Sequence, residues 1–256
     1  MRSAALAFLA ADGSSAKRLP PVWCADQLDR PTGSEGHGLA QRSTGHAALD
    51  AELPGGGWPA AGLIELLLPV PGCGELRLLA SALGQGGALL WVDPPLLPYA
   101  PALAALGVAP DRLVIVTAAK PADAAWAAEQ ALRSGALSAV LWWERGEGRP
   151  STATATLRRL HLAAQEGRTP LFALRPALVR GQSSPAPLRL ALEPAAPSRL
   201  VVDVFKRRGP PMAAPLTLVL PGPASRRARR AGAVPPRARD RQDHAVVRPA
   251  PERTAA

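Results

Sequence analysis

Cysteine and histidine are scarce in this sequence of 256 residues. Its two cysteines, Cys24 and Cys73, belong to no CxxC pair, and its four histidines are scattered along the chain. Zinc and related metals need such residues in spaced groups, so we predict no metal site. Two isolated cysteines also fit a reducing compartment, where disulfides are rare.

Aromatic side chains make up only 4% of the chain, although 47% of its residues are hydrophobic. The core must therefore consist mainly of Leu and small side chains. We expect five tryptophans to be its large members, namely Trp58, Trp91, Trp126, Trp142 and Trp143. No stretch approaches the roughly 18 consecutive apolar residues of a membrane helix, so we predict a cytoplasmic protein without a membrane partner.

Lysine is rare, and almost all of the positive charge comes from Arg; the formal net charge is +10. Residues 226–253 contain nine Arg against three acidic residues, a surplus of six that leaves +4 for the rest of the chain. Such a tail can attract nucleic-acid phosphates without sequence preference. A composition rich in Arg, Ala and Pro also places Arg in any solvated segment, and the sequence leaves both interpretations open.

The composition divides the chain into three regions. Residues 1–42 mix Pro, Gly, Ser and charged residues without a period, which predicts a flexible lead-in where Trp23 is the one anchor able to dock. Residues 43–220 are predicted to form one core domain. Residues 221–256 are rich in Ala, Arg and Pro and too poor in large apolar residues to fold, so we predict a disordered basic tail.

Short apolar runs alternate with helical patterns through the core region. We expect strands at residues 63–68, 88–92, 113–117, 139–143 and 171–174, and helices at 75–83, 99–106, 121–134 and 152–166. This alternation predicts an α/β fold with a parallel sheet covered by helices on both faces. Three further short strands, at 188–192, 200–205 and 216–220, are expected to add an antiparallel edge.

The loop after the first predicted strand is where a nucleotide phosphate binds in such sheets. A working phosphate loop is Gly-rich and ends in Lys and Ser or Thr, which hold the phosphates and Mg²⁺. Here the loop contains no Lys, and the carboxylate of Glu75 would repel a triphosphate. We therefore predict a degenerate loop without a bound cofactor, made of Pro71, Gly72, Cys73, Gly74 and Glu75.

The other positions that carry phosphate chemistry point the same way. The second predicted strand ends in Asp93-Pro94-Pro95, and Pro95 cannot polarise a water molecule. Glu144, after the fourth strand, stands where an Mg²⁺-coordinating Asp is usual, but it has no Lys or hydroxyl partner in the loop. Phosphoryl transfer depends on these groups, so we predict that the protein is not an enzyme and has no catalytic residues.

Several motifs in this core resemble a known family. Residues 43–145 resemble the core of the RecA recombinases, and residues 43–220 are still more similar to the ImuA family of RecA-like proteins. The matching segments are LDAELPGGGWP at 49–59, GCGELRLL at 72–79, LPYAPALAAL at 97–106, WAAEQALRSG at 126–135 and FKRRG at 205–209.

The resemblance implies a RecA-like core and a non-enzymatic, accessory role in translesion DNA synthesis during the SOS response to DNA damage. The implied partners are an inactive Y-family polymerase homologue of the ImuB type and an error-prone replicative-type polymerase, with RecA and DNA as further candidates. The missing phosphate chemistry is also a trait of that family.

Two basic groups are candidates for contacts with DNA or a protein partner. In recombinases the loop after the fifth strand contacts single-stranded DNA, which by resemblance selects Arg175 and Arg180; Arg175 replaces a Gln that senses the nucleotide state. Lys206, Arg207 and Arg208 form a compact basic cluster at the end of the last long strand. Solvated loop residues and a charged strand end are the plain alternatives.

Two other functions remain open from the sequence. One is a residual ATP-dependent, DNA-binding RecA paralogue, against which the missing Lys and hydroxyl count. The other is a cell-division inhibitor that binds the division GTPase FtsZ, because the inhibitor SulA shares a shortened RecA-like fold. The segments GGGWP and FKRRG favour the ImuA family over both.

Overall fold

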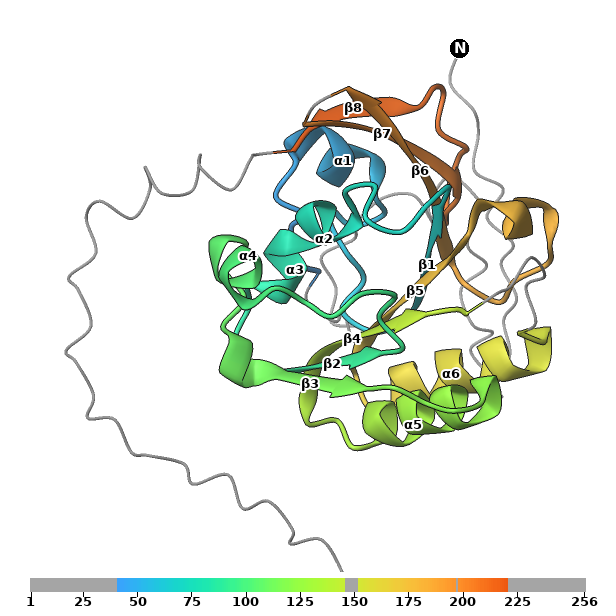
Figure 1. Ribbon diagram of the computed structural model, residues 1–256. Coiled ribbons are helices and arrows are strands. Elements are labelled where there is room, and N and C mark those ends of the chain that lie inside the picture. Colours follow the sequence, from blue (N-terminus) through green and yellow to red (C-terminus); the bar gives the residue numbers. More distant parts are fainter. Residues whose placement is uncertain (1–40, 146–151, 197, 221–256) are drawn as a thin grey trace, which may run out of the picture.

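The computed structural model describes residues 41–145, 152–196 and 198–220, which form a single eight-stranded sheet with helices on both faces (Figure 1). Nearly all of the predicted lead-in, including Trp23, and the basic tail lie outside these residues. The strands are β1 (Gly62–Leu68), β2 (Ala88–Val92), β3 (Leu113–Val116), β4 (Leu137–Trp143), β5 (Pro170–Pro176), β6 (Leu188–Ala196), β7 (Arg199–Lys206) and β8 (Leu216–Val219).

The sheet has the order β3-β2-β4-β5-β1-β6-β7-β8. The pairs from β3 across to β6 are all parallel, whereas β6–β7 and β7–β8 are antiparallel. This arrangement confirms the predicted RecA-like α/β fold with an antiparallel C-terminal edge. The first of the three late strands also extends the parallel part, because β6 pairs with β1 on one side and β7 on the other.

The helices are α1 (Ala47–Glu52), α2 (Glu75–Leu78), α3 (Ala80–Leu83), α4 (Ala100–Ala105), α5 (Pro121–Arg133) and α6 (Thr154–Glu166), with short 3₁₀ turns η2 (Pro110–Arg112) and η3 (Ala177–Gly181). The single helix expected at 75–83 is thus two short helices that meet at Leu79. None of the described helices is long and apolar enough to span a membrane.

Each face of the sheet has its own core. Apolar side chains of α1, α2, α3 and α4 pack on one face around Trp58, Trp91 and Phe172. On the other face α5 and α6 contribute mostly Ala and Leu, which pack against Leu63 and Trp142. The two layers are visible on either side of the sheet in Figure 1. Small side chains on α5 and α6 let these helices lie close to the strands, as the composition predicted.

One of the five expected core tryptophans is on the surface. Trp126 is 61% exposed, so its assignment to the core was wrong. It lies on α5 two positions from both Ala124 and Ala128, which are buried. Residues two apart in a helix point to nearly opposite sides, so Trp126 faces away from the sheet.

His161 on α6 secures the start of β1. Its Nδ1 accepts a hydrogen bond from the backbone N–H of Leu63, at 3.1 Å, which requires the neutral imidazole. Burial, assisted by the charge of Arg208, lowers the pKa of His161 below its ordinary value of 6.5. The unfolded chain therefore binds a proton more readily than the folded chain, and stability falls as the pH drops below about 6.5.

We predict that His161→Gln flattens this pH dependence, because an amide oxygen can replace Nδ1 as acceptor without titrating. Urea unfolding at pH 7.5, 6.5 and 5.5 measures the effect. The wild-type protein should lose more stability between pH 7.5 and 5.5 than His161→Gln, and Arg208→Gln should fall between them. Identical pH profiles for the wild type and His161→Gln would contradict the assignment.

Candidate functional site

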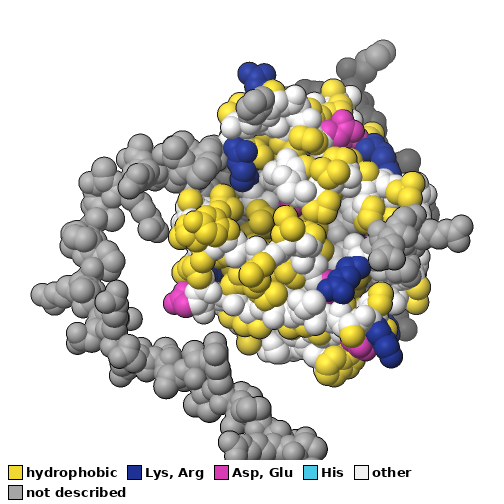
Figure 2. Space-filling view, viewed as in Figure 1, with side chains coloured by type: hydrophobic (Ala, Val, Ile, Leu, Met, Phe, Trp, Pro, Cys, Tyr) yellow, Lys and Arg dark blue, Asp and Glu magenta, His cyan; other side chains and the backbone are white. Residues whose placement is uncertain are grey.

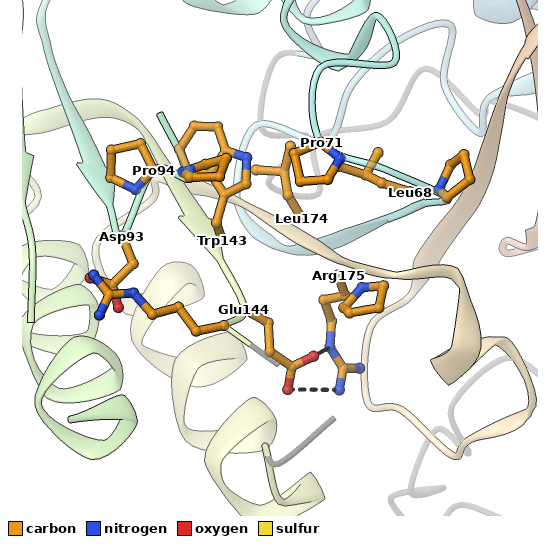
Figure 3. Close-up of a pocket in the computed structure, with 12 residues that line it drawn as sticks. Leu68, Pro71, Asp93, Pro94, Trp143, Glu144, Leu174 and Arg175 are labelled. Atoms are coloured by element: carbon orange, nitrogen blue, oxygen red, sulfur yellow. Dashed lines mark hydrogen bonds and ion pairs between the residues drawn. The ribbon is translucent and has the colours of Figure 1, made fainter. Parts of the chain in front are cut away.

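The carboxyl ends of β1, β2, β4 and β5 surround a pocket of about 640 Å³ (Figure 3). Ligands of open α/β sheets bind at this edge, so it is the place to look for function. Prolines and other apolar residues make up most of its lining, which consists of Leu68, Pro69, Pro71, Asp93, Pro94, Pro95, Trp143, Glu144, Arg145, Leu174, Arg175 and Pro176.

The degenerate phosphate loop connects β1 to α2 and keeps a strongly turned backbone. Gly72 and Gly74 have φ values of 83° and 126°, which other residues rarely adopt. A Cβ at Gly74 would also lie 2.9 Å from Cδ1 of Leu220, so the side chain of Leu220 would have to move to admit it. The glycines predicted to shape the loop therefore do so, although the residues that bind phosphate are missing.

Glu75 fills the anion-binding position of this loop with its own carboxylate. One oxygen accepts a hydrogen bond from the backbone N–H of Gly72 at 2.6 Å, and the other accepts one from Gly74 at 3.0 Å. The residue is only 3% exposed. Backbone N–H groups in such a turn are the donors that hold phosphate in nucleotide-binding proteins. In this chain two of them are already bound to an internal anion.

Cys73 lies in the same loop and packs against the core, and its thiol is expected to be unreactive at neutral pH. Burial, followed by the negative charge of Glu75, raises the pKa of Cys73 to about 12. The thiolate is the reactive form of cysteine. Cys73 therefore behaves as a small apolar side chain at neutral pH.

Arg175 is buried inside the protein, with 1% of its side chain exposed. Its Nε donates to Glu144 at 2.8 Å and its Nη1 donates to Glu65 at 3.1 Å. Figure 3 shows the Glu144–Arg175 pair next to the pocket. The prediction that Arg175 contacts DNA was therefore wrong, because the guanidinium is enclosed by two carboxylates. A metal ion at this place would have to compete with Arg175 for the same carboxylate oxygens.

The ion pairs around Arg175 extend to β6 through Glu65. Glu65 accepts hydrogen bonds from Nε of Arg189 and from Oγ of Ser184, each at 2.6 Å. Arg189 also donates to the carbonyl groups of Val179 and Gln182. We call Glu65, Glu144, Arg175 and Arg189 the buried charge cluster; its two acids and two arginines give a net charge of zero.

Sequence reasoning missed Glu65 and Arg189. Residues 63–68 were interpreted as a continuous apolar run, although Glu65 lies in its middle. A carboxylate in a strand covered on both faces is costly unless a buried group pairs with it, and this signal was present in the sequence. Arg189 occupies the register position beside Glu65 in the parallel β1–β6 pair, which only the sheet topology reveals.

Asp93 and Arg145 form a second ion pair at the pocket, at 2.7 Å. Asp93 also accepts a hydrogen bond from the backbone N–H of Ala118, at 2.8 Å. It adopts a left-handed backbone conformation, with φ of 52°, immediately after β2. Within the described residues no three His, Cys, Asp or Glu side chains are grouped as metal ligands.

The remaining basic candidates are Arg180, Lys206, Arg207 and Arg208, and they differ in exposure and in contacts. Arg180 pairs with Asp203 at 2.6 Å and lies over the ring of Phe205. Lys206 donates to the carbonyl group of Ser184 at 2.7 Å.

The three members of the basic cluster predicted at the end of β7 have different contacts and different exposure. Nη1 of Arg207 forms an ion pair with the carboxylate of Glu52, at 2.7 Å, and only 11% of the Arg207 side chain is exposed. Arg208 is exposed and lies near enough to His161 to lower the pKa of the imidazole. Lys206 and Arg208 are thus the accessible members of the cluster, and their contact with DNA or a partner stays a prediction.

We predict that Arg175→Met destabilises the protein by about 3–5 kcal/mol, because it leaves the buried carboxylate of Glu144 without its arginine partner and gives the buried charge cluster an unbalanced negative charge. Arg180→Met is the matched control: its ion pair is half-exposed, and the loss should stay near or below about 1 kcal/mol. Urea unfolding at pH 7.5 measures both. A loss for Arg175→Met no larger than for the control would show that Arg175 is solvated, as a DNA contact would be.

We also predict that Cys73 reacts slowly with iodoacetamide in a Cys24→Ser background. Alkylation at pH 8 should be on the order of a hundredfold slower than in the urea-unfolded chain, because the raised pKa leaves little thiolate. Adding Glu75→Gln to this background should accelerate the reaction by removing the neighbouring charge. Equal alkylation rates with and without Glu75→Gln would contradict the position of the carboxylate.

The chain matches no protein-family model and no curated protein. The assignment to the ImuA family therefore rests on the sequence motifs and on the RecA-like fold, and it stays a prediction.

Proposed function

We propose that this chain is a non-enzymatic accessory protein of the SOS-induced translesion synthesis complex. It acts by binding other proteins, with DNA as a second candidate contact, and it belongs to the ImuA family in the cytoplasm. Its partners are an inactive Y-family polymerase homologue of the ImuB type and an error-prone replicative-type polymerase, with RecA as a further candidate.

The position of Glu75 is the observation that supports this proposal most. A nucleotide at the loop would have to displace a carboxylate that two backbone N–H groups hold at 2.6 and 3.0 Å. It would also meet no lysine that could compensate the phosphate charge in the loop. Both effects oppose ATP binding, and phosphoryl transfer relies on the missing groups.

Glu144 supports the same conclusion at the metal position. Its carboxylate accepts hydrogen bonds from Arg175 and from the backbone N–H of Thr152. Only 1% of its side chain is exposed. Coordination of Mg²⁺ would break these contacts and leave Arg175 without one of its two buried partners, which is costly. A protein that keeps the sheet of an ATPase without this chemistry is suited to binding.

The expected result of an ATPase assay is no turnover above background with purified protein, with or without single-stranded DNA. RecA serves as the positive control. Glu75→Ala should not restore activity, because it removes the blocking carboxylate without supplying Lys or an Mg²⁺ ligand. Turnover that Glu144→Gln abolishes would overturn the non-enzymatic proposal and favour the ATP-dependent RecA paralogue.

Binding measurements separate the translesion role from division inhibition. Purified protein should bind the Y-family polymerase homologue encoded by the same cell, and it should not bind FtsZ. Expression in growing cells should not cause filamentation. Binding to FtsZ with filamentation, and without binding to the polymerase homologue, would assign the SulA-like function instead.

A further inference from the structure

The pocket at the carboxyl edge of the sheet is mainly apolar. Leu68 and Pro71 line it from the β1 side, Pro94 follows β2, and Trp143 and Leu174 come from β4 and β5. Figure 3 shows these five side chains along one wall. A volume of about 640 Å³ is within the range of small-ligand pockets, and it can also take a large side chain of a protein partner.

The charged groups at the pocket compensate one another. Asp93 pairs with Arg145, and Glu144 pairs with Arg175, so the lining contributes two negative and two positive charges. A charged occupant would have to compete with these contacts, whereas an uncharged one leaves them intact. The charge pattern therefore matches a neutral, apolar group and disfavours a nucleotide.

Exposed apolar side chains lie next to the pocket-lining residues along the chain. Val70 lies between two lining prolines and is 57% exposed, and Leu96, directly after Pro95, is 78% exposed. Leu97 and Tyr99 follow at 86% and 72% exposed. Figure 2 shows hydrophobic side chains extending from the region of α4 towards the middle of this face, with most charged side chains nearer its border.

Single exposed hydrophobic residues are ordinary, but a group of them beside a neutral pocket is typical of a protein-binding surface. Protein interfaces often centre on one large side chain that enters a pocket while neighbouring apolar residues exclude water. We call Val70, Leu96, Leu97 and Tyr99 the apolar rim. A small solute would fill the pocket without covering this rim, whereas a protein segment covers both.

We propose that the pocket and the apolar rim bind a protein partner through one large, uncharged side chain of that partner, of the Trp, Phe or Leu type. The proposal rests on the accessory function proposed above and assigns its partner-binding surface. The position that holds a nucleotide in related sheets thus binds protein in this chain.

The first experiment measures binding of the full-length chain to the purified Y-family polymerase homologue. Val70→Asp and Leu97→Asp each place a charge in the apolar rim, and both positions are exposed, so folding should be unaffected. Leu162→Asp is the matched control, because Leu162 is a half-exposed apolar residue on α6, away from the pocket. We expect at least a tenfold weaker Kd for the rim variants and less than a twofold change for the control.

Equal Kd values for the rim variants and the wild type would overturn the proposal while leaving the accessory function intact. If the wild type does not bind the polymerase homologue, the accessory function fails, and a second measurement decides about the pocket. In that measurement N-acetyl-L-tryptophanamide, an uncharged aromatic probe, is titrated into methyl-labelled protein and followed by NMR.

We expect the probe to shift the methyl signals of Leu68 and Leu174 but not that of Leu162. No shift at Leu68 and Leu174 up to the solubility limit of the probe would overturn the proposal. Displacement of the probe by ADP would also overturn it, because the pocket would then be a nucleotide site.

Discussion

The compensation of buried charge is the constraint on which this structure depends. Arg175 lies between Glu65 and Glu144 with 1% of its side chain exposed, and Glu65 also pairs with Arg189, so every charge of the cluster has a buried partner of opposite sign. Removing an ion from water into a protein interior costs several kcal/mol unless partners satisfy it. Hydrogen bonds of the buried charge cluster join β1, β5 and β6 to the end of β4, and three of these strands, β1, β4 and β5, also border the pocket.

This constraint also decides what the pocket edge can do. The carboxylate of Glu144 stands where a metal ligand is expected, but it is bound by Arg175, and the carboxylate of Glu75 is bound by the phosphate loop itself. Both carboxylates that could interact with a ligand therefore already have partners within the protein. Among the described residues, the apolar side chains of the rim beside this edge are exposed, so their burial offers the larger gain in free energy on binding.

The sequence predicted the architecture because the fold depends on local patterns. Apolar runs at 88–92 and 139–143 and the helix at 121–134 lie within a few residues of the observed elements. The candidate site was harder to predict because it depends on register. Arg175 looks like a loop residue until the parallel pairing of β1 with β5 places it in the strand and close to Glu65. The assignment of Trp126 to the core was wrong because it rested on composition, which says nothing about which side of a helix a residue occupies.

The glycines of the degenerate phosphate loop explain why its turn keeps a phosphate-loop shape although the loop contains no lysine. Gly74 is favoured by its backbone angle, with φ of 126°, which does not depend on a bound phosphate. The turn that joins β1 to α2 therefore keeps its shape through its glycines, and its N–H groups still need an acceptor, which Glu75 provides. With these donors satisfied inside the fold, the apolar parts of the same edge are the ones that a bound protein would cover under the proposal made above.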